Sequence, residues 1–295
     1  MFSEFSILER LNSDPTVLAA KEEASEVLGR LVDEPHSSGI FTDFDGTLST
    51  IVEQPFTARP LNGVLEVLEC LVKSFNCVAV ISGRPVEFLV ERLGRDLLEE
   101  GLNLVGLHGL ERMTNSGEVA VAPEAVPFQE ALSVCMRTLR DKLPESVLVE
   151  DNGWSIAVHW RNNPALAEGI ESLAREQASL HGLAVHPGRK LLELRPPIEV
   201  SKGSALRLLA YGLEAACFLG DDAGDLAAFD MLDQLRDAAG MKVLKVAVAS
   251  SESPDRLISS ADIVVNGPTG ALFFLRLLCN EVELKAVPRP SGHAD

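Results

Sequence analysis

Short apolar runs alternate along the chain with longer stretches in which apolar residues recur every three or four positions. Continuous apolar runs such as Cys77–Ile81 and Ala216–Leu219 are typical of strands that are buried on both faces. The recurrence of Val64, Leu68 and Leu71 indicates an amphipathic helix. Strands that alternate with helices in this way predict an α/β fold built on a parallel sheet.

The pattern near the N-terminus predicts a helix that leads into the first strand. Asp14-Pro15 has the form of an N-cap followed by a proline in the first helical turn. Apolar residues then recur at helical spacing, at Val17, Leu18, Val27, Leu28 and Leu31. We therefore expect one amphipathic packing helix in this part of the chain.

The pattern changes at about Met113. A helical stretch is followed by two alternating segments on either side of Asn152-Gly153, a dipeptide that is a strong hairpin signal. A helix over residues 164–180 comes next, and two further short strands are predicted with a turn at His186-Pro187-Gly188. The second of these strands spans residues 190–195. This order of elements favours a small antiparallel α+β domain inserted into the α/β core.

A chain of 295 residues is long enough for this two-domain organisation. We place the core at residues 1–112 and 199–295 and the inserted domain at residues 113–198. The cysteines are scattered, without the paired spacing of a metal site, at Cys70, Cys77, Cys135, Cys217 and Cys279. They indicate small core residues in a reducing compartment, and we expect a cytoplasmic protein.

The formal net charge of -18 argues against two classes of partner. Nucleic acids and anionic membranes both attract basic surfaces, so we expect neither as a partner. No segment approaches the roughly 20 apolar residues that a membrane-spanning helix requires. A small anionic molecule held by a few local cations remains compatible with this charge. The sequence does not define an oligomeric state, and a monomer is consistent with it.

Two carboxylates follow the first predicted strand. Asp43 and Asp45 are two residues apart, so in an extended segment their side chains point to the same side. Two anions this close repel each other unless a cation lies between them, and Mg²⁺ suits carboxylates combined with phosphate oxygens. One carboxylate can then attack phosphorus while the other transfers the proton. Gly46 permits a sharp turn and Thr47 offers a hydroxyl, although a plain turn after a strand is an equal alternative.

Polar residues also follow the next two predicted strands. Ser82 and Arg84 come directly after Cys77–Ile81, where open α/β sheets bind their ligands. Taken alone, Ser82 is more simply an N-cap and Arg84 a solvated charge at a helix start. His108 and Glu111 follow a third strand, and each is either a substrate contact or an ordinary loop residue.

The core resumes with a lysine at a predicted helix start. Lys202 is unfavourable there for the helix dipole, so an interaction with carboxylates and phosphate would explain its position. The next strand ends in Asp221, Asp222 and Asp225, of which N-caps account for one or two. The simplest joint explanation is that these acids and the Asp43 pair surround one Mg²⁺.

The order of these motifs resembles that of the haloacid dehalogenase superfamily of phosphohydrolases. Its four motifs match Asp43–Thr47, Ser82, Lys202 and Asp221–Asp225 in order, and the resemblance covers essentially the whole chain. It implies a Rossmann-like parallel-sheet core with an inserted α+β cap of the C2 type. It also implies that Asp43 is the phosphorylated nucleophile, that Asp45 is the acid/base, and that Lys202 and Ser82 hold the phosphoryl group. The implied Mg²⁺ ligands are Asp43, the backbone carbonyl of Asp45, Asp221, Asp222 and Asp225.

The inserted region is similar to that of the trehalose-6-phosphate phosphatases. The similarity lies in the segments Gly106–Glu111, Val149–Arg161 and Leu191–Pro196. In that family the cap supplies the sugar contacts, and charged acceptors bind hydroxyl groups strongly. The implied substrate-binding residues are Arg84, His108, Glu111, Glu150, His159, Arg161 and Glu193.

The chain departs from the usual pattern of this family at four positions. Asn152 stands where lysine is usual, and it also has the simpler reading of a hairpin residue. Trp160 replaces a common tyrosine, and Gly224 and Leu226 stand where threonine and glutamate are common. The resemblance therefore does not extend to the cap contact that this lysine makes in the family.

The resemblance implies a Mg²⁺-dependent phosphatase that hydrolyses trehalose 6-phosphate to trehalose and inorganic phosphate. A phosphatase of another sugar phosphate, such as sucrose phosphate or a glycosyl phosphoglycerate, would use the same core chemistry, and only the cap residues distinguish it. A catalytically silent protein that binds sugar phosphates is a third hypothesis, which the filled catalytic positions disfavour.

Overall fold

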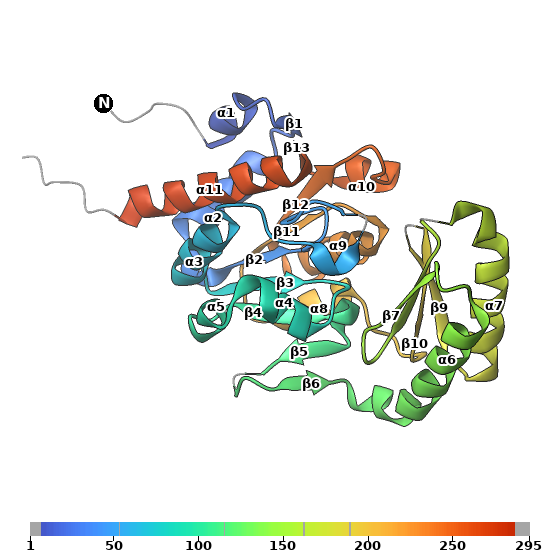
Figure 1. The fold of residues 1–295 in the computed structure, drawn as a ribbon. Coiled ribbons are helices and arrows are strands. Elements are labelled where there is room, and N and C mark those ends of the chain that lie inside the picture. The colour runs from blue at the N-terminus through green and yellow to red at the C-terminus, as the bar shows by residue number, and fades with distance from the viewer. Residues whose placement is uncertain (1–6, 53, 115, 162, 189, 287–295) are drawn as a thin grey trace, which may run out of the picture. The chain divides into compact units, whose positions relative to one another are not determined.

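The computed structural model describes residues 7–52, 54–114, 116–161, 163–188 and 190–286 (Figure 1). Contacts divide the chain into two compact units. The first unit contains the described residues up to Ser82, the segment Leu89–Leu104, and the described residues from Ser201 onward. The second unit contains Gly83–Phe88 and Val105–Val200. It therefore includes residues before position 113, and the assignment of a catalytic core and a substrate cap stays a prediction.

The first unit is built on a sheet whose strands have the order β1-β13-β12-β11-β2-β3-β4. Strands β13, β12, β11, β2 and β3 run parallel to their neighbours in this order, and β1 is antiparallel to β13 at the edge. The strands are β1 (Val17–Ala20), β2 (Ser38–Thr42), β3 (Cys77–Ile81), β4 (Asn103–Gly106), β11 (Ala215–Gly220), β12 (Lys242–Ala249) and β13 (Ile263–Asn266). The parallel α/β core predicted from the apolar runs is confirmed.

Helices cover this sheet, and β2, β3 and β11 are buried along their whole lengths. Helix α11 packs against α2 and α3, while α8 and α9 pack against each other, and both groups contact the sheet (Figure 1). The helices are α1 (Ile7–Asn12), α2 (Ala24–Asp33), α3 (Val64–Ser74), α4 (Val86–Leu93), α5 (Arg95–Glu99), α8 (Lys202–Leu209), α9 (Leu226–Ala239), α10 (Asp255–Ser260) and α11 (Gly267–Ala286). In the described part of the chain, no helix combines the length and apolar character needed to cross a membrane.

The helix predicted to start at Asp14-Pro15 is wrong in its first part. Val17–Ala20 forms strand β1, which pairs with β13, and the helix α2 begins only at Ala24. The Asp14 carboxylate accepts hydrogen bonds from the backbone and hydroxyl groups of Thr16, which makes a local turn rather than a helix start. Pairing with a strand far along the chain overrides the local helical spacing.

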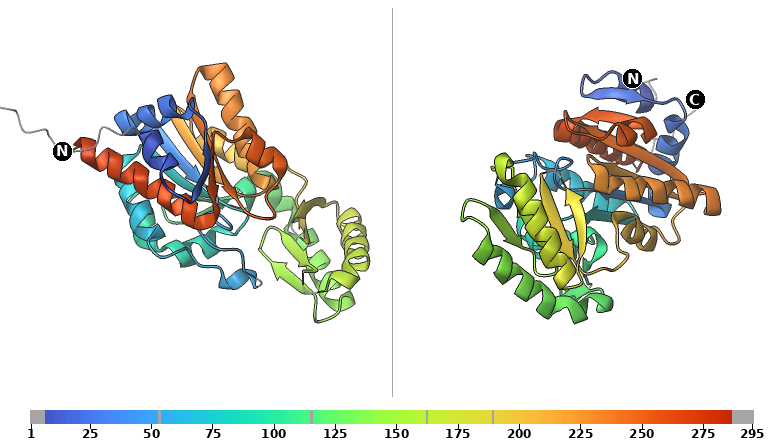
Figure 2. Two further views of the ribbon diagram at one scale, coloured as in Figure 1. Left: turned by 90° about the horizontal axis from the view of Figure 1, so that it is seen from above. Right: turned by 90° about the vertical axis from the view of Figure 1, so that its right-hand side faces the viewer.

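The second unit contains a four-stranded antiparallel sheet with the order β7-β8-β10-β9. Helices α6 and α7 pack on one face of it, and this side holds the apolar core of the unit, including Val158, Leu192 and Leu194 (Figure 2). The elements are β5 (Glu111–Met113), β6 (Val119–Val121), α6 (Gln129–Lys142), β7 (Leu148–Asp151), β8 (Ile156–His159), α7 (Ala167–Leu180), β9 (Ala184–Gly188) and β10 (Leu191–Arg195). The predicted hairpin at Asn152-Gly153 is confirmed.

The turn predicted at His186-Pro187-Gly188 is wrong. These residues belong to β9, where His186 pairs with Glu193 and Pro187 with Leu192 of β10. Pro187 and Gly188 are tolerated because β9 is an edge strand. As a result His186 has a defined position on one face of the sheet.

Candidate active site

Lys202 joins the loop that follows β2 to the loop that follows β11. Its ammonium nitrogen Nζ lies 2.7 Å from Oδ1 of Asp43 and donates a hydrogen bond to Oδ1 of Asp225 at 2.7 Å. All three side chains are buried, with Lys202 only 3% exposed. The strands β2 and β11 are parallel neighbours, so their carboxyl ends meet at one edge of the sheet. The structure thus brings together residues that are far apart in the sequence.

Asp225 organises the loop after β11. Its Oδ2 accepts hydrogen bonds from the backbone amides of Asp221 and Asp222, at 2.8 and 3.0 Å. A Cβ atom added at Gly220 would lie 2.3 Å from Cγ of Asp225, so glycine is required for this close approach. Asp225 therefore fixes the backbone at Asp221 and the ammonium of Lys202 at the same time.

Asp43, Asp221 and Asp225 form a group that is suited to a metal ion. Each offers a carboxylate oxygen, and these oxygens all lie within 4.8 Å of one another. Gly46 has φ +79°, and a Cβ atom at this position would lie 2.2 Å from Oδ2 of Asp221. Glycine is thus needed both for the left-handed turn and for the approach of the loop to Asp221. A compact set of buried carboxylate oxygens fits a hard divalent cation such as Mg²⁺.

The remaining predicted catalytic residues lie around this group. Asp45 is partly exposed and forms a β-bridge with Ser49 in the turn after β2. The Thr47 hydroxyl is buried and has no hydrogen-bond partner in the described part of the chain. Ser82 directly follows β3, next to β2, and is buried. Asp222 lies outside the three-carboxylate group, and its Oδ1 accepts a hydrogen bond from the Gly224 amide at 2.8 Å.

Burial and neighbouring charges shift the pKa values of Asp43 and Lys202 in this site. Burial raises the pKa of Asp43 well above its usual value, Lys202 opposes this rise, and the nearby carboxylates of Asp225 and Asp221 add to it. Burial by itself would lower the pKa of Lys202, but Asp225 and Asp43 outweigh it, so this pKa is well above the usual lysine value. The lysine therefore stays protonated near neutral pH. One lysine beside a group of carboxylates leaves an excess of negative potential that favours a further cation.

In the second unit, Glu111 holds the start of α4. Its Oε2 accepts a hydrogen bond from the backbone amide of Val86, the first residue of that helix, at 2.9 Å. The backbone carbonyl of Arg84 also accepts a hydrogen bond from the amide of Leu107, at 3.0 Å. Burial raises the pKa of Glu111, and the bond from Val86 opposes the rise. The carboxylate thus has a structural partner, and its predicted contact with substrate stays a prediction.

Arg84 and His159 both lie close to Glu150. Glu150 Oε2 is 2.6 Å from Nε2 of His159, and its Oε1 is 4.0 Å from Nη1 of Arg84. The Arg84 guanidinium carbon lies 4.7 Å from the ring centre of Phe88, a cation–π contact that fixes its orientation. Arg161 lies in the turn after β8 and is partly exposed.

His108 and Glu193 form a second pair in this unit. Nε2 of His108 lies 3.3 Å from Oε2 of Glu193. Leu107 and His108 both have positive φ values, 48° and 59°, an uncommon conformation for residues with side chains. Burial would raise the pKa of Glu193, but His108, Arg195 and Ser155 together lower it to about 2. Glu193 is therefore ionised at all physiological pH values.

Sequence reasoning missed two residues beside Glu193. Arg195 is buried, and its Nη1 lies 4.0 Å from Oε2 of Glu193. Nη2 of Arg195 lies 2.9 Å from Nδ1 of His186. Period-two alternation in the predicted strand places Arg195 on the same face as Glu193 and was an available signal. His186 could not be found in this way because it was predicted to lie in a turn.

Comparison with known proteins identifies the family. The family model described as trehalose-phosphatase matches residues 41–262 of this chain, which is most of its length. This chain belongs to the trehalose-phosphatase family. A trehalose-phosphate phosphatase of Mycobacterium marinum is 32% identical over 228 residues, which cover 74% of this chain and 55% of that protein. The chain thus spans about half the length of that relative.

Solved structures agree with this family at the level of the fold. A trehalose-6-phosphate phosphatase related protein has a TM-score of 0.70 at 23% identity, covering 84% of this chain and 99% of that one. The C-terminal domain of the C. albicans trehalose-6-phosphate phosphatase has a TM-score of 0.70 at 22% identity, covering 90% of this chain and 99% of that one. A haloacid dehalogenase-like hydrolase from Bacteroides thetaiotaomicron has a TM-score of 0.56 at 18% identity, covering 81% of this chain and 98% of that one. The haloacid dehalogenase fold expected from the sequence motifs is therefore confirmed at the level of the fold.

Asn152 has a defined place in this member of the trehalose-phosphatase family. Its backbone amide donates to the Ser155 carbonyl at 3.0 Å, and its side-chain amide lies 3.5 Å from the Ser155 hydroxyl. Ser155 in turn donates a hydrogen bond that lowers the pKa of Glu193. Asn152 is thus a hairpin residue that is also connected to Glu193 through Ser155.

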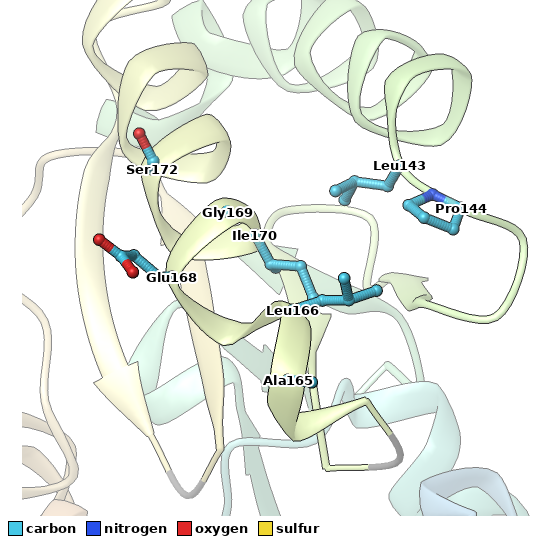
Figure 3. A pocket seen from close by; sticks show the side chains of 8 residues that line it. All are labelled: Leu143, Pro144, Ala165, Leu166, Glu168, Gly169, Ile170 and Ser172. Atoms are coloured by element: carbon cyan, nitrogen blue, oxygen red, sulfur yellow. The ribbon is translucent and has the colours of Figure 1, made fainter.

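A surface depression of about 520 Å³ lies on the helical side of the second unit (Figure 3). Its lining residues are Leu143, Pro144, Ala165, Leu166, Glu168, Gly169, Ile170 and Ser172. None of these belongs to the predicted site of this trehalose-phosphatase family member. We therefore assign the depression no part in the chemistry.

Proposed function

We propose that this protein hydrolyses trehalose 6-phosphate to trehalose and inorganic phosphate. The observation that carries the proposal is the buried Asp43, which lies 2.7 Å from Lys202 and within one group with Asp221 and Asp225. A carboxylate that lies beside a protonated lysine, within a set of carboxylates able to bind a metal ion, is suited to phosphoryl transfer. Positioning and charge stabilisation supply most of the rate of that reaction. Membership of the trehalose-phosphatase family supports the choice of substrate.

The proposed reaction has two steps. In the first, a carboxylate oxygen of Asp43 forms a bond to phosphorus, the bond from phosphorus to the sugar oxygen breaks, and Asp45 donates a proton to that oxygen. Trehalose leaves, and an aspartyl phosphate remains. In the second, Asp45 removes a proton from water, the water oxygen attacks phosphorus, and the bond to Asp43 breaks to release phosphate. Asp45 is reprotonated and Asp43 regenerated for the next cycle.

Other residues of the first unit hold the phosphoryl group. The ammonium of Lys202 attracts its negative oxygens, and the Ser82 hydroxyl donates a hydrogen bond. The buried hydroxyl of Thr47, which has no partner in the described part of the chain, is a further donor. Arg84 is the second positive charge that we propose for these oxygens.

The metal ligands that we propose are Asp43, the backbone carbonyl of Asp45, Asp221 and Asp225. Asp222 is an additional candidate, although one of its oxygens caps the backbone at Gly224. Mg²⁺ is the proposed ion, because all of these ligands are oxygens. When bound, it supplies positive charge that offsets the charge of the phosphoryl oxygens.

The proposed sugar contacts lie in the second unit. Glu150 and Glu193 accept hydrogen bonds from hydroxyl groups, and charged acceptors form stronger hydrogen bonds than neutral ones. His108 and His159 are each paired with one of these carboxylates and orient it. Arg161 and Glu111 complete the proposed set of substrate-binding residues.

A panel of phosphorylated sugars tests this proposal. The purified protein is given Mg²⁺ and trehalose 6-phosphate, sucrose 6-phosphate, glucosyl-3-phosphoglycerate or glucose 6-phosphate, and inorganic phosphate is measured. We expect kcat/KM to be highest for trehalose 6-phosphate. A higher value for another member of the panel would replace the substrate but keep the chemistry. Binding of trehalose 6-phosphate without release of phosphate would instead support a silent binding protein.

We propose a small sugar phosphate as the ligand of this site, and neither a nucleic acid nor a membrane as a partner. The cytoplasmic location expected from the cysteine pattern stays a prediction. The sequence does not define the oligomeric state, which size-exclusion chromatography with light scattering measures directly.

A further inference from the structure

One face of the four-stranded sheet in the second unit carries a row of aligned side chains. Glu150 on β7 is opposite Ala157 on β8, Ala157 is opposite Glu193 on β10, and Glu193 is opposite His186 on β9. Directly opposed residues point to the same side of a sheet. The helices α6 and α7 pack against the other side, among residues such as Val158 and Leu192. His186 therefore lies on the same polar face as the two glutamates.

Arg195 determines which nitrogen of His186 carries the proton. Nη2 of Arg195 lies 2.9 Å from Nδ1 of His186. A guanidinium has only donors and does not lose its proton in proteins, so Nδ1 has to be the acceptor. In the neutral imidazole ring the proton is then on Nε2. His186 thus presents a hydrogen-bond donor at Nε2 whose tautomer is fixed by its neighbour.

The surroundings keep this ring neutral. Burial and the positive charge of Arg195 lower the pKa of His186, and His108 lowers it further. Glu193 has the opposite effect and raises it. A neutral ring with its proton on Nε2 sits beside Glu193, which is an ionised acceptor. Neighbouring donor and acceptor groups match two neighbouring hydroxyl groups of a sugar ring, one of which accepts while the other donates.

Arg195 is not explained as a simple ion pair. It is buried, its nearest approach to Glu193 is 4.0 Å, and its Nε and Nη1 have no hydrogen-bond partner in the described part of the chain. Buried donors without partners cost stability, so such a residue calls for a reason beyond packing. Contact with both Glu193 and His186 supplies that reason, because one guanidinium then orients an acceptor and a donor.

We propose that His186 is a specificity-determining residue whose Nε2 donates a hydrogen bond to a hydroxyl group of the carbohydrate part of the substrate. Arg195 is the positioning residue that fixes the tautomer of His186 and attracts Glu193. This inference rests on the proposed sugar-phosphate phosphatase activity. It extends that activity by naming a donor that complements the acceptors Glu150 and Glu193.

Two substitutions of His186 separate its two nitrogens. In His186→Asn the side-chain oxygen can still accept from Arg195, but the donor at the Nε2 position is lost. In His186→Gln the amide nitrogen reaches the Nε2 position and retains a donor. The measurement is kcat/KM for trehalose 6-phosphate divided by kcat/KM for p-nitrophenyl phosphate, which has no sugar. We expect this ratio to fall about 10- to 100-fold in His186→Asn, mainly through KM, and to be largely restored in His186→Gln.

A second pair of variants tests the position and the tautomer. His181→Asn, at the C-terminal end of α7, is the matched control and should leave the ratio unchanged. Arg195→Lys keeps a positive charge but loses the guanidinium geometry, so it should lower the ratio in the same direction as His186→Asn. Circular dichroism spectra and melting temperatures identify any variant that does not fold.

The outcomes distinguish this inference from the proposed function. An unchanged ratio in folded His186→Asn, or an equal loss with both substrates, would overturn the role of His186 in sugar recognition. A ratio as low in His186→Gln as in His186→Asn would also overturn it, because the donor is then irrelevant. If the unmodified protein hydrolyses p-nitrophenyl phosphate but no sugar phosphate, the proposed function fails before any variant is compared.

Discussion

The ammonium group of Lys202 lies 2.7 Å from the carboxylate of Asp43, although Lys202 starts helix α8 and Asp43 directly follows strand β2. A lysine in the first turn of a helix opposes the helix dipole. Here the two carboxylates of Asp43 and Asp225 outweigh that cost, since both contact the same nitrogen. This contact makes Lys202 part of the site rather than part of the surface.

Replacement of Asp43 by asparagine should abolish phosphate release without unfolding the protein. Asparagine has nearly the same shape but does not act as a nucleophile toward phosphorus, so we expect kcat to fall by at least about 1,000-fold. Phosphate release under Mg²⁺ and circular dichroism are the measurements. Asp141→Asn, at an exposed position of α6, is the control and should keep full activity. Substantial residual turnover in Asp43→Asn would show that another group attacks phosphorus.

Replacement of Lys202 by methionine should reduce both stability and activity. Its loss leaves Asp43 and Asp225 buried without their cation, which typically costs about 3–5 kcal/mol in the free energy of unfolding. Urea unfolding measures this loss. Lys245→Met is a matched control, because Lys245 is also buried and its Nζ lies 2.8 Å from Asp233. We expect Lys245→Met to lower stability but retain phosphate release, whereas Lys202→Met loses both. Retained activity in folded Lys202→Met would contradict the proposed role of this lysine.

Binding of Mg²⁺ should raise the melting temperature of the protein, and chelation should reverse this rise. A ligand that binds only the folded state stabilises it, and this stabilisation grows with the logarithm of the ligand concentration once that exceeds the dissociation constant. In Asp221→Asn the Mg²⁺ concentration needed to produce the same rise in melting temperature should increase at least about tenfold, because a charged ligand is lost. Asp222→Asn keeps the hydrogen bond to Gly224, since asparagine is also a good N-cap. An equal effect of both substitutions would make Asp222 a ligand of the ion.

Replacement of Glu193 by glutamine should change stability in a pH-dependent way. The pKa of this group is lowered from 4.5 to about 2 on folding, so its contribution is complete above pH 4.5 and is lost as the pH falls toward 2. Near neutral pH we expect Glu193→Gln to lower the free energy of unfolding by about 2 kcal/mol, as for a lost hydrogen bond to a charged group. Urea unfolding between pH 2 and 7 is the measurement.

The control for this measurement is Glu145→Gln, at an exposed position after α6. It should have almost no effect at any pH, because exposed carboxylates contribute little. If the difference between the unmodified protein and Glu193→Gln does not shrink between pH 4.5 and 2, ionisation of Glu193 is not the source of the stability.

The local sequence determined those features that depend only on neighbouring residues. Continuous apolar runs identified β3 and β11, and Asn152-Gly153 identified the hairpin between β7 and β8. Acids, a hydroxyl and a lysine after these runs identified the loops that carry the proposed chemistry. These signals work because the end of a buried parallel strand has a fixed place in an α/β fold.

The tertiary structure alone decided which of these groups meet and which strands pair. Val17 and Leu18 have helical spacing to later residues, yet they form β1 because β13 lies beside them. Antiparallel pairing with β10 moved His186 from a predicted turn to a position opposite Glu193. Strand pairing and burial depend on residues distant in sequence, so no local pattern contains them. The charges and the resemblance led us to expect Asp43, Lys202 and Asp225 around one ion, but only the folded chain showed that Lys202 contacts both carboxylates.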